Sequence, residues 1–321
     1  MISLKRTAWG IVCGALLALS SMGPCAQDFP ARAISIVVPA APGGTVDINA
    51  RPLAQVLTRL LGQSVIVENR GGLAVEYMTK QPADGYTLFL SSAALGVNAT
   101  LYPKLNYDPV KDFAGITQMY SSAYLLVVPP SLGVKTARDL IAMAKAKPGA
   151  LNFSSAGTGS GTHFASEVFK DAAKIDVVHV PYKGIPEAMN DTMTNRVQFF
   201  MAPIANAVPQ VRDGKLLALG VSSLKRDALL PDVPTIADSG VPGYDAILWF
   251  GLVTTAKTPA PVIAELNREV KRILSEDDVK RRWAPIGLEP SPTTPEGFDK
   301  LIASDIATFT KLAKAGNIKA Q

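Results

Sequence analysis

Two glycine-rich turns carry the residues best suited to bind a small molecule. The first turn follows the apolar segment Ile36–Val38 and precedes a helical pattern. Its candidate ligand-binding residues are Pro42, Gly43, Gly44, Thr45 and Asp47. Because glycine has no Cβ atom, backbone N–H groups can approach a ligand closely there, and the N-terminus of the next helix favours a carboxylate or a phosphate. An ordinary strand-to-helix turn would have the same spacing, so spacing alone leaves both interpretations open.

The second turn lies between Ser154 and His163 and repeats this arrangement. Its candidate ligand-binding residues are Thr158, Gly159, Ser160 and His163. Backbone N–H groups and hydroxyl donors from both turns could hold a small anion without any lysine or arginine. Two other motifs do not fit. A dinucleotide-binding turn needs a third glycine where Thr162 stands, and a nucleophile elbow needs glycines two residues on either side of Ser160.

Only two histidines, His163 and His179, are available for catalysis or for metal binding. An exported hydrolase would have to pair Ser160 with His163, and this is the alternative function that the residues allow. His163 stands at a predicted helix start, where it could cap the helix, bond a neighbour or face a ligand. His179 lies within a short apolar strand, where we expect it to be a packed residue or an edge residue. Since the two histidines do not stand at helical spacing and the carboxylates are scattered, we predict no metal site and no cofactor.

The N-terminus has the pattern of a signal peptide for export. Lys5 and Arg6 precede an apolar run from Trp9 to Leu19. This run is shorter than the roughly 20 apolar residues that a membrane-spanning helix needs. We therefore expect residues 1–26 to be removed by cleavage after Ala26.

Composition limits the class of protein further. Both cysteines, Cys13 and Cys25, fall within the predicted signal peptide, so the mature chain would contain neither disulfides nor thiol chemistry. The formal net charge of +5 falls to +3 when Lys5 and Arg6 are removed. No clustered basic stripe accompanies this charge, so we expect no binding to nucleic acid. The length suggests two domains with a large hydrophobic core.

Short β-branched segments alternate with helical patterns along the rest of the chain, which is typical of an α/β fold with parallel strands. Strands are predicted at 34–38, 64–67, 87–90, 124–128, 151–154, 177–180, 197–201, 218–221 and 246–253. Helices are predicted from the first turn to residue 61, between 67 and 87, and at 137–145, 163–173, 185–194, 261–274, 276–284 and 296–314. Pro52 is expected to kink or restart the first helix.

The apolar segment Tyr124–Val128 ends at two prolines, and a second domain is predicted to begin there. The first domain would comprise residues 27–125 and 246–321, and the second would comprise residues 126–245. The chain would cross twice between these two lobes, which predicts a hinge. A ligand would then bind in the cleft at the carboxyl ends of the strands.

Short motifs spread over the chain after the leader match, in their order, those of a known family. They are Val38–Pro39, Ala41–Thr45 with Asp47, Val67–Arg70, Pro82–Leu88, Tyr107–Pro109, Lys111–Phe113, Ser155–Ser160 with His163, Val180–Gly184, Leu230–Thr235, and Trp249 with Gly251. Through these motifs the chain resembles the Bug family of exported substrate-binding receptors, which are associated with tripartite tricarboxylate transporters.

The resemblance implies a two-lobed periplasmic binding protein of type II, in which each lobe is a mainly parallel sheet flanked by helices. It implies a monomer without enzymatic activity that closes over a small carboxylate metabolite in the periplasm. The partners would be membrane transporter subunits or a sensor ectodomain. It also implies ligand-binding roles for residues of both turns, namely Gly43, Gly44, Thr45, Asp47, Gly159, Ser160 and His163.

Two of the candidate side chains have alternative roles. Asp47 could cap the helix or hold the turn, or it could orient a water molecule or accept a ligand hydroxyl or ammonium. Tyr182 could line the cleft, because an amphipathic aromatic suits a ligand wall, or it could pack in the core.

Three departures from the family pattern concern the ligand. The segment Arg70–Glu76 reaches the next helix early, which alters a wall of the cleft. Gln198 and Ala202 stand where family members commonly have aspartates, which argues against an amino acid as the ligand because its ammonium would want a carboxylate. Pro52 interrupts the first helical pattern. The shortened segment also leaves open a receptor that has lost its ligand and acts only by protein contact.

Overall fold

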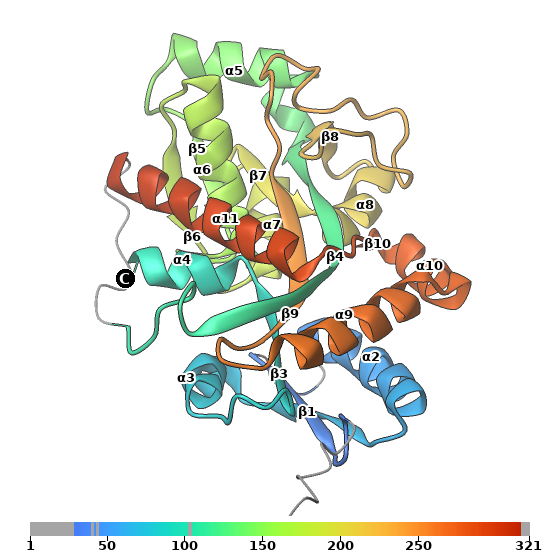
Figure 1. The fold of residues 1–321 in the computed structure, drawn as a ribbon. Coiled ribbons are helices and arrows are strands. Elements are labelled where there is room, and N and C mark those ends of the chain that lie inside the picture. Colours follow the sequence, from blue (N-terminus) through green and yellow to red (C-terminus); the bar gives the residue numbers. More distant parts are fainter. Residues whose placement is uncertain (1–28, 40–41, 43–44, 102–104, 316–321) are drawn as a thin grey trace, which may run out of the picture.

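The computed structural model describes residues 29–39, 42, 45–101 and 105–315 (Figure 1). The predicted signal peptide and both cysteines lie outside these residues, and so do Gly43 and Gly44. Within the described part of the chain, no helix has the length and apolar character needed to span a membrane.

The predicted alternation of strands and helices is confirmed. The strands are β1 (Ile34–Val38), β2 (Val65–Asn69), β3 (Thr87–Ser92), β4 (Phe113–Val128), β5 (Asn152–Ser155), β6 (Val178–Pro181), β7 (Phe199–Pro203), β8 (Leu217–Val221), β9 (Ile247–Thr255) and β10 (Glu289–Pro290). The α-helices are α2 (Thr45–Leu61), α3 (Ala74–Thr79), α4 (Ala94–Leu101), α5 (Ala137–Ala146), α6 (Gly161–Ala173), α7 (Ile185–Met193), α8 (Ile204–Arg212), α9 (Ala260–Ser275), α10 (Asp277–Trp283) and α11 (Pro295–Ala315).

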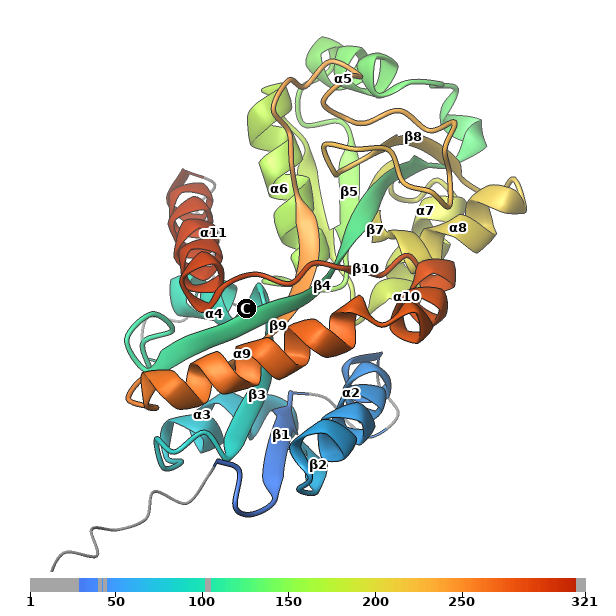
Figure 2. The same ribbon diagram turned by 45° about the vertical axis from the view of Figure 1, so that its right-hand side comes forward.

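The strands form two groups, joined by two long strands. In lobe 1, β1 lies between β2 and β3 and is parallel to both. In lobe 2, β5 lies between β6 and β7 and is parallel to both. The strands β4 and β9 pair antiparallel and run between the lobes (Figure 2). The two-lobed α/β fold with two crossings is therefore confirmed, whereas the lobe boundaries near residues 125 and 246 stay predictions.

The strand β4 is longer than the sequence predicts, because the apolar segment Tyr124–Val128 continues a strand that begins at Phe113. Its first part pairs with β9, and its last part pairs with β7 and β8. The register against β9 shifts twice along this length. Such irregularities interrupt the alternation of inward and outward side chains on which strand prediction depends.

The helices differ from the predictions in two ways. Neither α4 nor α8 is among the predicted elements, since α4 is apolar around most of its surface and α8 contains Pro209. Pro52 lies inside α2, yet α2 runs without interruption from Thr45 to Leu61, so the helix does not restart there.

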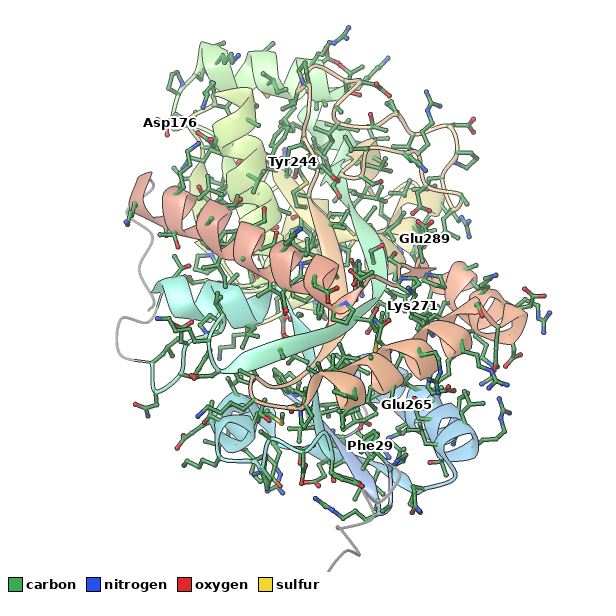
Figure 3. The ribbon with its side chains drawn as sticks, viewed as in Figure 1. Phe29, Asp176, Tyr244, Glu265, Lys271 and Glu289 are labelled. Carbon is green, nitrogen blue, oxygen red and sulfur yellow. The ribbon has the colours of Figure 1, made fainter. Side chains whose placement is uncertain are left out.

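The last helix, α11, packs across both lobes (Figure 2). In lobe 1 it lies against α4 and β4. In lobe 2 its Phe309 contacts Phe164 of α6, with ring centroids 3.5 Å apart. Trp249 of β9 is buried and donates its indole N–H to Asp305 of α11 at 2.6 Å, so this tryptophan belongs to the core. Tyr244, labelled in Figure 3, is buried in lobe 2. Its hydroxyl donates to the carbonyl of Ala165 in α6 at 2.9 Å.

Candidate functional site

Two glycines give the second turn its shape. The φ angles of Gly157 and Gly159 are 117° and 81°, in a region that residues with a Cβ atom rarely adopt. Ser160 is the N-cap of α6, because its Oγ accepts the backbone N–H of His163 at 3.2 Å. The same Oγ lies 2.9 Å from Oγ1 of Thr162. The turn therefore presents the N-terminus of a 13-residue helix at the carboxyl end of β5, an arrangement that favours an anion.

His163 lies behind this turn. It is 1% exposed, and its Nδ1 accepts the backbone N–H of Gly159 at 3.2 Å. Burial, reinforced by the charges of His179 and Lys170, lowers the pKa of His163 to about 3. The ring is therefore neutral with its proton on Nε2, which lies 3.8 Å from an oxygen of Glu167. This geometry makes His163 a support that positions Gly159 from inside lobe 2.

The ring of His163 is itself supported by the stacked rings of His179 and Phe153. The centroid of its ring lies 3.9 Å from that of His179, and His179 stacks on Phe153 at 4.9 Å. The Oγ of Ser155 is 2.6 Å from Nε2 of His179. Burial lowers the pKa of His179 to about 4 and raises the pKa of Glu167. His179 is thus half-buried and packs from the edge strand β6, in agreement with the prediction of a packed or edge residue.

This arrangement argues against the hydrolase alternative. A serine nucleophile needs a hydrogen bond to the ring of its base, but the Nδ1 of His163 is occupied by Gly159 and its Nε2 faces Glu167. Ser155 and His179 are in contact, yet Ser155 is 0% exposed and cannot meet a substrate. Among the described residues, no group of three His, Cys, Asp or Glu side chains could hold a metal ion.

The first turn is described in part. Pro42 is exposed and Thr45 begins α2, while Gly43 and Gly44 fall outside the described residues. The turn therefore stands, as predicted, between the end of β1 and the start of a helix.

Asp47 is fixed by bonds within lobe 1. It is 1% exposed. Its carboxylate accepts Nε and Nη2 of Arg51, both at 2.9 Å, and Nδ2 of Asn69 at 3.0 Å. Because Asn69 ends β2, these bonds tie the first turn of α2 to the neighbouring strand. They favour the interpretation that Asp47 holds the turn.

A third strand-to-helix turn lies beside the first, and sequence reasoning missed it. β3 is parallel to β1 and is hydrogen-bonded to it, so their carboxyl ends meet at one edge of the sheet. Ser91 and Ser92 end β3, and α4 begins at Ala94. The run of small residues from Ser91 to Ala94 was the available signal, but it could be interpreted only once α4 was known.

Tyr182 joins the second turn at the edge of lobe 2. Its backbone N–H donates to the carbonyl of Ser155 at 3.0 Å. Its hydroxyl donates to Asp191 of α7 at 2.8 Å. Burial and this hydrogen bond raise the pKa of Tyr182 to about 12, so the phenol stays protonated. The structure thus places Tyr182 beside Ser155 and Gly157 of the second turn. This turn, with Thr158, Gly159 and Ser160, lies on the lobe opposite Pro42, Thr45 and Asp47.

The segment after β2 is as short as the sequence predicts. A single turn of 3₁₀-helix, η1 (Gly71–Leu73), passes directly into α3 at Ala74. Arg70 precedes it and forms an ion pair with Glu68 at 2.6 Å. Leu73 is 70% exposed.

Comparison with known proteins identifies the family. A family model for the tripartite tricarboxylate transporter family receptor, TctC, matches residues 49–318. The chain belongs to this receptor family. Protein BugT of Bordetella pertussis is 33% identical over 300 residues, which cover 92% of each chain. A relative from Pseudomonas sp. (strain P51), a UPF0065 protein in the tcbD-tcbE intergenic region, is 32% identical over 310 residues, which cover 94% of this chain and 92% of the relative.

Solved structures of similar receptors share the fold. R. palustris Rpa4515 with adipate is 33% identical, with a TM-score of 0.76, and the match covers 91% of this chain and 99% of that one. MatC from Rhodopseudomonas palustris with bound malate is 30% identical, with a TM-score of 0.73, and the match covers 88% and 99%. The periplasmic binding protein BugD also matches, at 27% identity and a TM-score of 0.73, over 91% of this chain and 100% of that one. The chain is thus a periplasmic solute-binding receptor of this family.

Proposed function

We propose that this receptor binds a small dicarboxylate between the first and second turns and delivers it to the membrane subunits of a tripartite tricarboxylate transporter. The geometry of the second turn is the main observation that supports this proposal. Its positive-φ glycines and the Ser160 cap present the N-terminus of α6 at the edge of lobe 2. At the edge of lobe 1, α2 and α4 begin directly after β1 and β3. A dicarboxylate would place one carboxylate at each edge, where helix N-termini stabilise negative charge.

The ligands of two relatives support this class of molecule. Adipate and malate, bound in the structures of Rpa4515 and MatC, are both dicarboxylates. Each of these receptors is at least 30% identical to this chain over most of its length. Receptors this similar would use the same cleft, with differences in its walls deciding which acid fits.

The candidate residues divide into ligand contacts and supports. Backbone N–H groups of Gly43 and Gly44, together with the hydroxyl groups of Thr45, Thr158 and Ser160, would donate to the carboxylates. Gly159 would shape the second turn and let the chain approach the ligand closely, because its own N–H is already bonded to His163. Pro42 and Tyr182 would form apolar walls. Asp47 and His163 would act indirectly, because their polar atoms already bond to Arg51, Asn69 and Gly159.

The cellular setting that we propose rests on the N-terminal export pattern and on the receptor family. Residues 1–26 would direct export and be removed, and the mature receptor would work in the periplasm as a monomer. It would carry out no chemical reaction on its ligand. Closure of the lobes about β4 and β9 would present the loaded receptor to its membrane partner, a transporter or a sensor ectodomain.

Isothermal titration calorimetry with adipate, malate, citrate and acetate tests the proposal. We expect a dicarboxylate to bind best. We expect Gly159→Val to weaken binding by at least about tenfold, because a side chain at this positive φ would displace the neighbouring Ser160 hydroxyl, and losing one charge-assisted hydrogen bond costs about 1.5–3 kcal/mol. Gly214→Val is the matched control. Gly214 also has a positive φ, 68°, but follows α8 with no atoms around it that a Cβ would meet. If no carboxylate bound the unmodified receptor, the alternative of a receptor acting only by protein contact would replace this proposal.

A further inference from the structure

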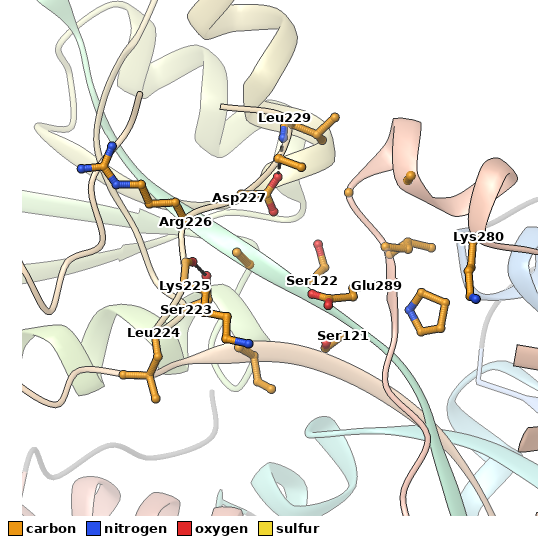
Figure 4. A pocket seen from close by; sticks show the side chains of 17 residues that line it. Ser121, Ser122, Ser223, Leu224, Lys225, Arg226, Asp227, Leu229, Lys280 and Glu289 are labelled. Carbon is orange, nitrogen blue, oxygen red and sulfur yellow. Dashed lines mark hydrogen bonds between the residues drawn. The ribbon is translucent and has the colours of Figure 1, made fainter. Parts of the chain in front are cut away.

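A cavity of about 700 Å³ lies against the crossing strands and shares no residue with either glycine-rich turn (Figure 4). One wall is the segment 223–229, which follows β8 in lobe 2. Another wall is formed by residues of 280–290, the segment that includes the end of α10 and β10. Ser121 and Ser122 of β4 and Ile247 of β9 lie between these walls. The cavity therefore joins parts of both lobes at a place away from the proposed carboxylate site.

A nearly buried hydroxyl group faces this cavity. Ser122 is 6% exposed, and its Oγ forms no hydrogen bond with the described residues. Figure 4 shows it pointing into the cavity. The neighbouring serines are already bonded, Ser121 to Ser291 at 2.7 Å and Ser223 to the carbonyl of Lys225 at 2.7 Å. Because buried polar groups normally have a partner, the Oγ of Ser122 is available to a ligand.

Two opposite charges stand on the two walls. Lys225 lies on the wall from lobe 2 and Glu289 on the wall from β10, and neither forms an ion pair within the described part of the chain. The other charged groups are engaged. Arg226 donates to the carbonyl of Pro231 at 3.0 Å, Asp227 accepts the N–H of Leu229 at 2.8 Å, and Lys280 pairs with Asp277 at 3.7 Å. Among the described residues that line the cavity, Lys225 and Glu289 are thus an exposed cation and an exposed anion whose charged atoms form neither an ion pair nor a hydrogen bond.

The rest of the lining is mostly apolar. Leu224, Leu229, Ile247, Leu288 and Pro290 all contribute to it. A concave site with apolar walls and a few convergent polar groups is typical of a small-molecule site, and the volume falls within the roughly 300–1,000 Å³ that such sites occupy.

We propose that this cavity is a second ligand site, for a small zwitterion of the amino-acid type. The ligand carboxylate would bind to Lys225 and Ser122, and its ammonium would bind to Glu289. A ligand with a single charge would leave one of the two side chains without a partner, whereas a zwitterion forms a charge-assisted bond with each. The apolar lining would hold the ligand side chain. The proposal does not depend on the carboxylate site.

Calorimetry with L-leucine and L-serine tests this site on the mature receptor. Two analogues of leucine test the contribution of each charged group to binding. The compound 4-methylpentanoate lacks the ammonium, and leucinamide lacks the carboxylate. We expect an amino acid to bind, both analogues to bind at least tenfold more weakly than leucine, and Lys225→Met, Glu289→Gln and Ser122→Ala each to weaken amino-acid binding at least tenfold. Lys215→Met, at an exposed lysine outside the cavity, is the control.

Three results would overturn the proposal. They are the absence of binding by either amino acid, equal binding of leucine and 4-methylpentanoate, and amino-acid binding that survives the cavity substitutions but is lost in Gly159→Val. The last result would place the amino acid in the cleft between the turns. Adipate titrated into the Lys225→Met variant should bind as it does to the unmodified receptor, so failure of either site is recognised independently of the other.

Discussion

Asp47 is a buried carboxylate whose bonds lie within the scaffold beside a proposed binding turn. We expect Asp47→Asn to lower the free energy of unfolding by about 1.5 kcal/mol, the low end for a hydrogen bond to a charged group, because the partner Arg51 is half-exposed. Urea denaturation would measure the loss. Glu76→Gln is a matched control, because Glu76 and Lys80 form an ion pair at the same i,i+4 spacing on an exposed surface. Equal losses in both variants would show that burial of Asp47 adds nothing.

Because the pKa of His163 is lowered in the folded receptor, we expect the free energy of unfolding to decrease in acid. Its pKa is about 3 in the folded receptor and about 6.5 in an unfolded chain. Between these values only the unfolded chain binds the proton, so the free energy of unfolding falls as the pH falls, by about 1.4 kcal/mol per pH unit. His179, with a pKa of about 4, acts in the same direction. Glu167, whose pKa is raised, acts in the opposite direction above the pKa of an unfolded glutamate.

Urea denaturation at pH 7 and pH 5 separates the contribution of His163 from the others. We expect His163→Gln to lose less stability than the unmodified receptor over this interval, because the variant cannot bind the proton. An equal loss in the two proteins would mean that the folded receptor accepts a protonated His163.

At the scale of elements, the start of α6 is packed tightly against the crossing strand β4. A Cβ atom added to Gly161 would overlap with the hydroxyl of Tyr124, whose side chain is itself buried. We expect Gly161→Ala to destabilise the receptor by about 1–3 kcal/mol, the usual cost of overpacking, and to weaken carboxylate binding. Tyr124→Phe removes the obstructing oxygen and should restore part of both losses. A double-mutant cycle measures this coupling, and a double variant as unstable as Gly161→Ala alone would contradict the explanation.

The elements also show what the sequence can predict. Amphipathic helices such as α5 and α9 lie within a few residues of their predicted bounds, because their apolar residues recur at helical spacing. The glycine-rich turns were found because their residue types dictate local geometry. The roles of His163, and the placement of Ser91 beside the first turn, depend on which segments meet in space. No local pattern encodes those contacts.

The whole molecule depends on α11, which contacts both lobes. Phe309 of this helix is buried against Phe164 of α6. We expect Phe309→Ala to lower the free energy of unfolding by about 3 kcal/mol or more, as for other phenylalanines removed from a core. Thr308→Ala, at an exposed position on the same helix, should change stability little. Denaturation of both variants is the measurement, and similar stability of the two would show that α11 does not hold the lobes.

The position of β9 has a consequence for how the chain folds after it crosses a membrane. In lobe 1, β9 lies between β3 and β4, so β1, β2 and β3 form a sheet with an open edge until residues 247–255 arrive. Strands β5 to β8, in contrast, end by residue 221 and need only the last part of β4. A chain that is translocated with its N-terminus first would therefore complete lobe 2 before lobe 1. The strands that emerge first must wait for β9, which emerges only after all the strands of lobe 2.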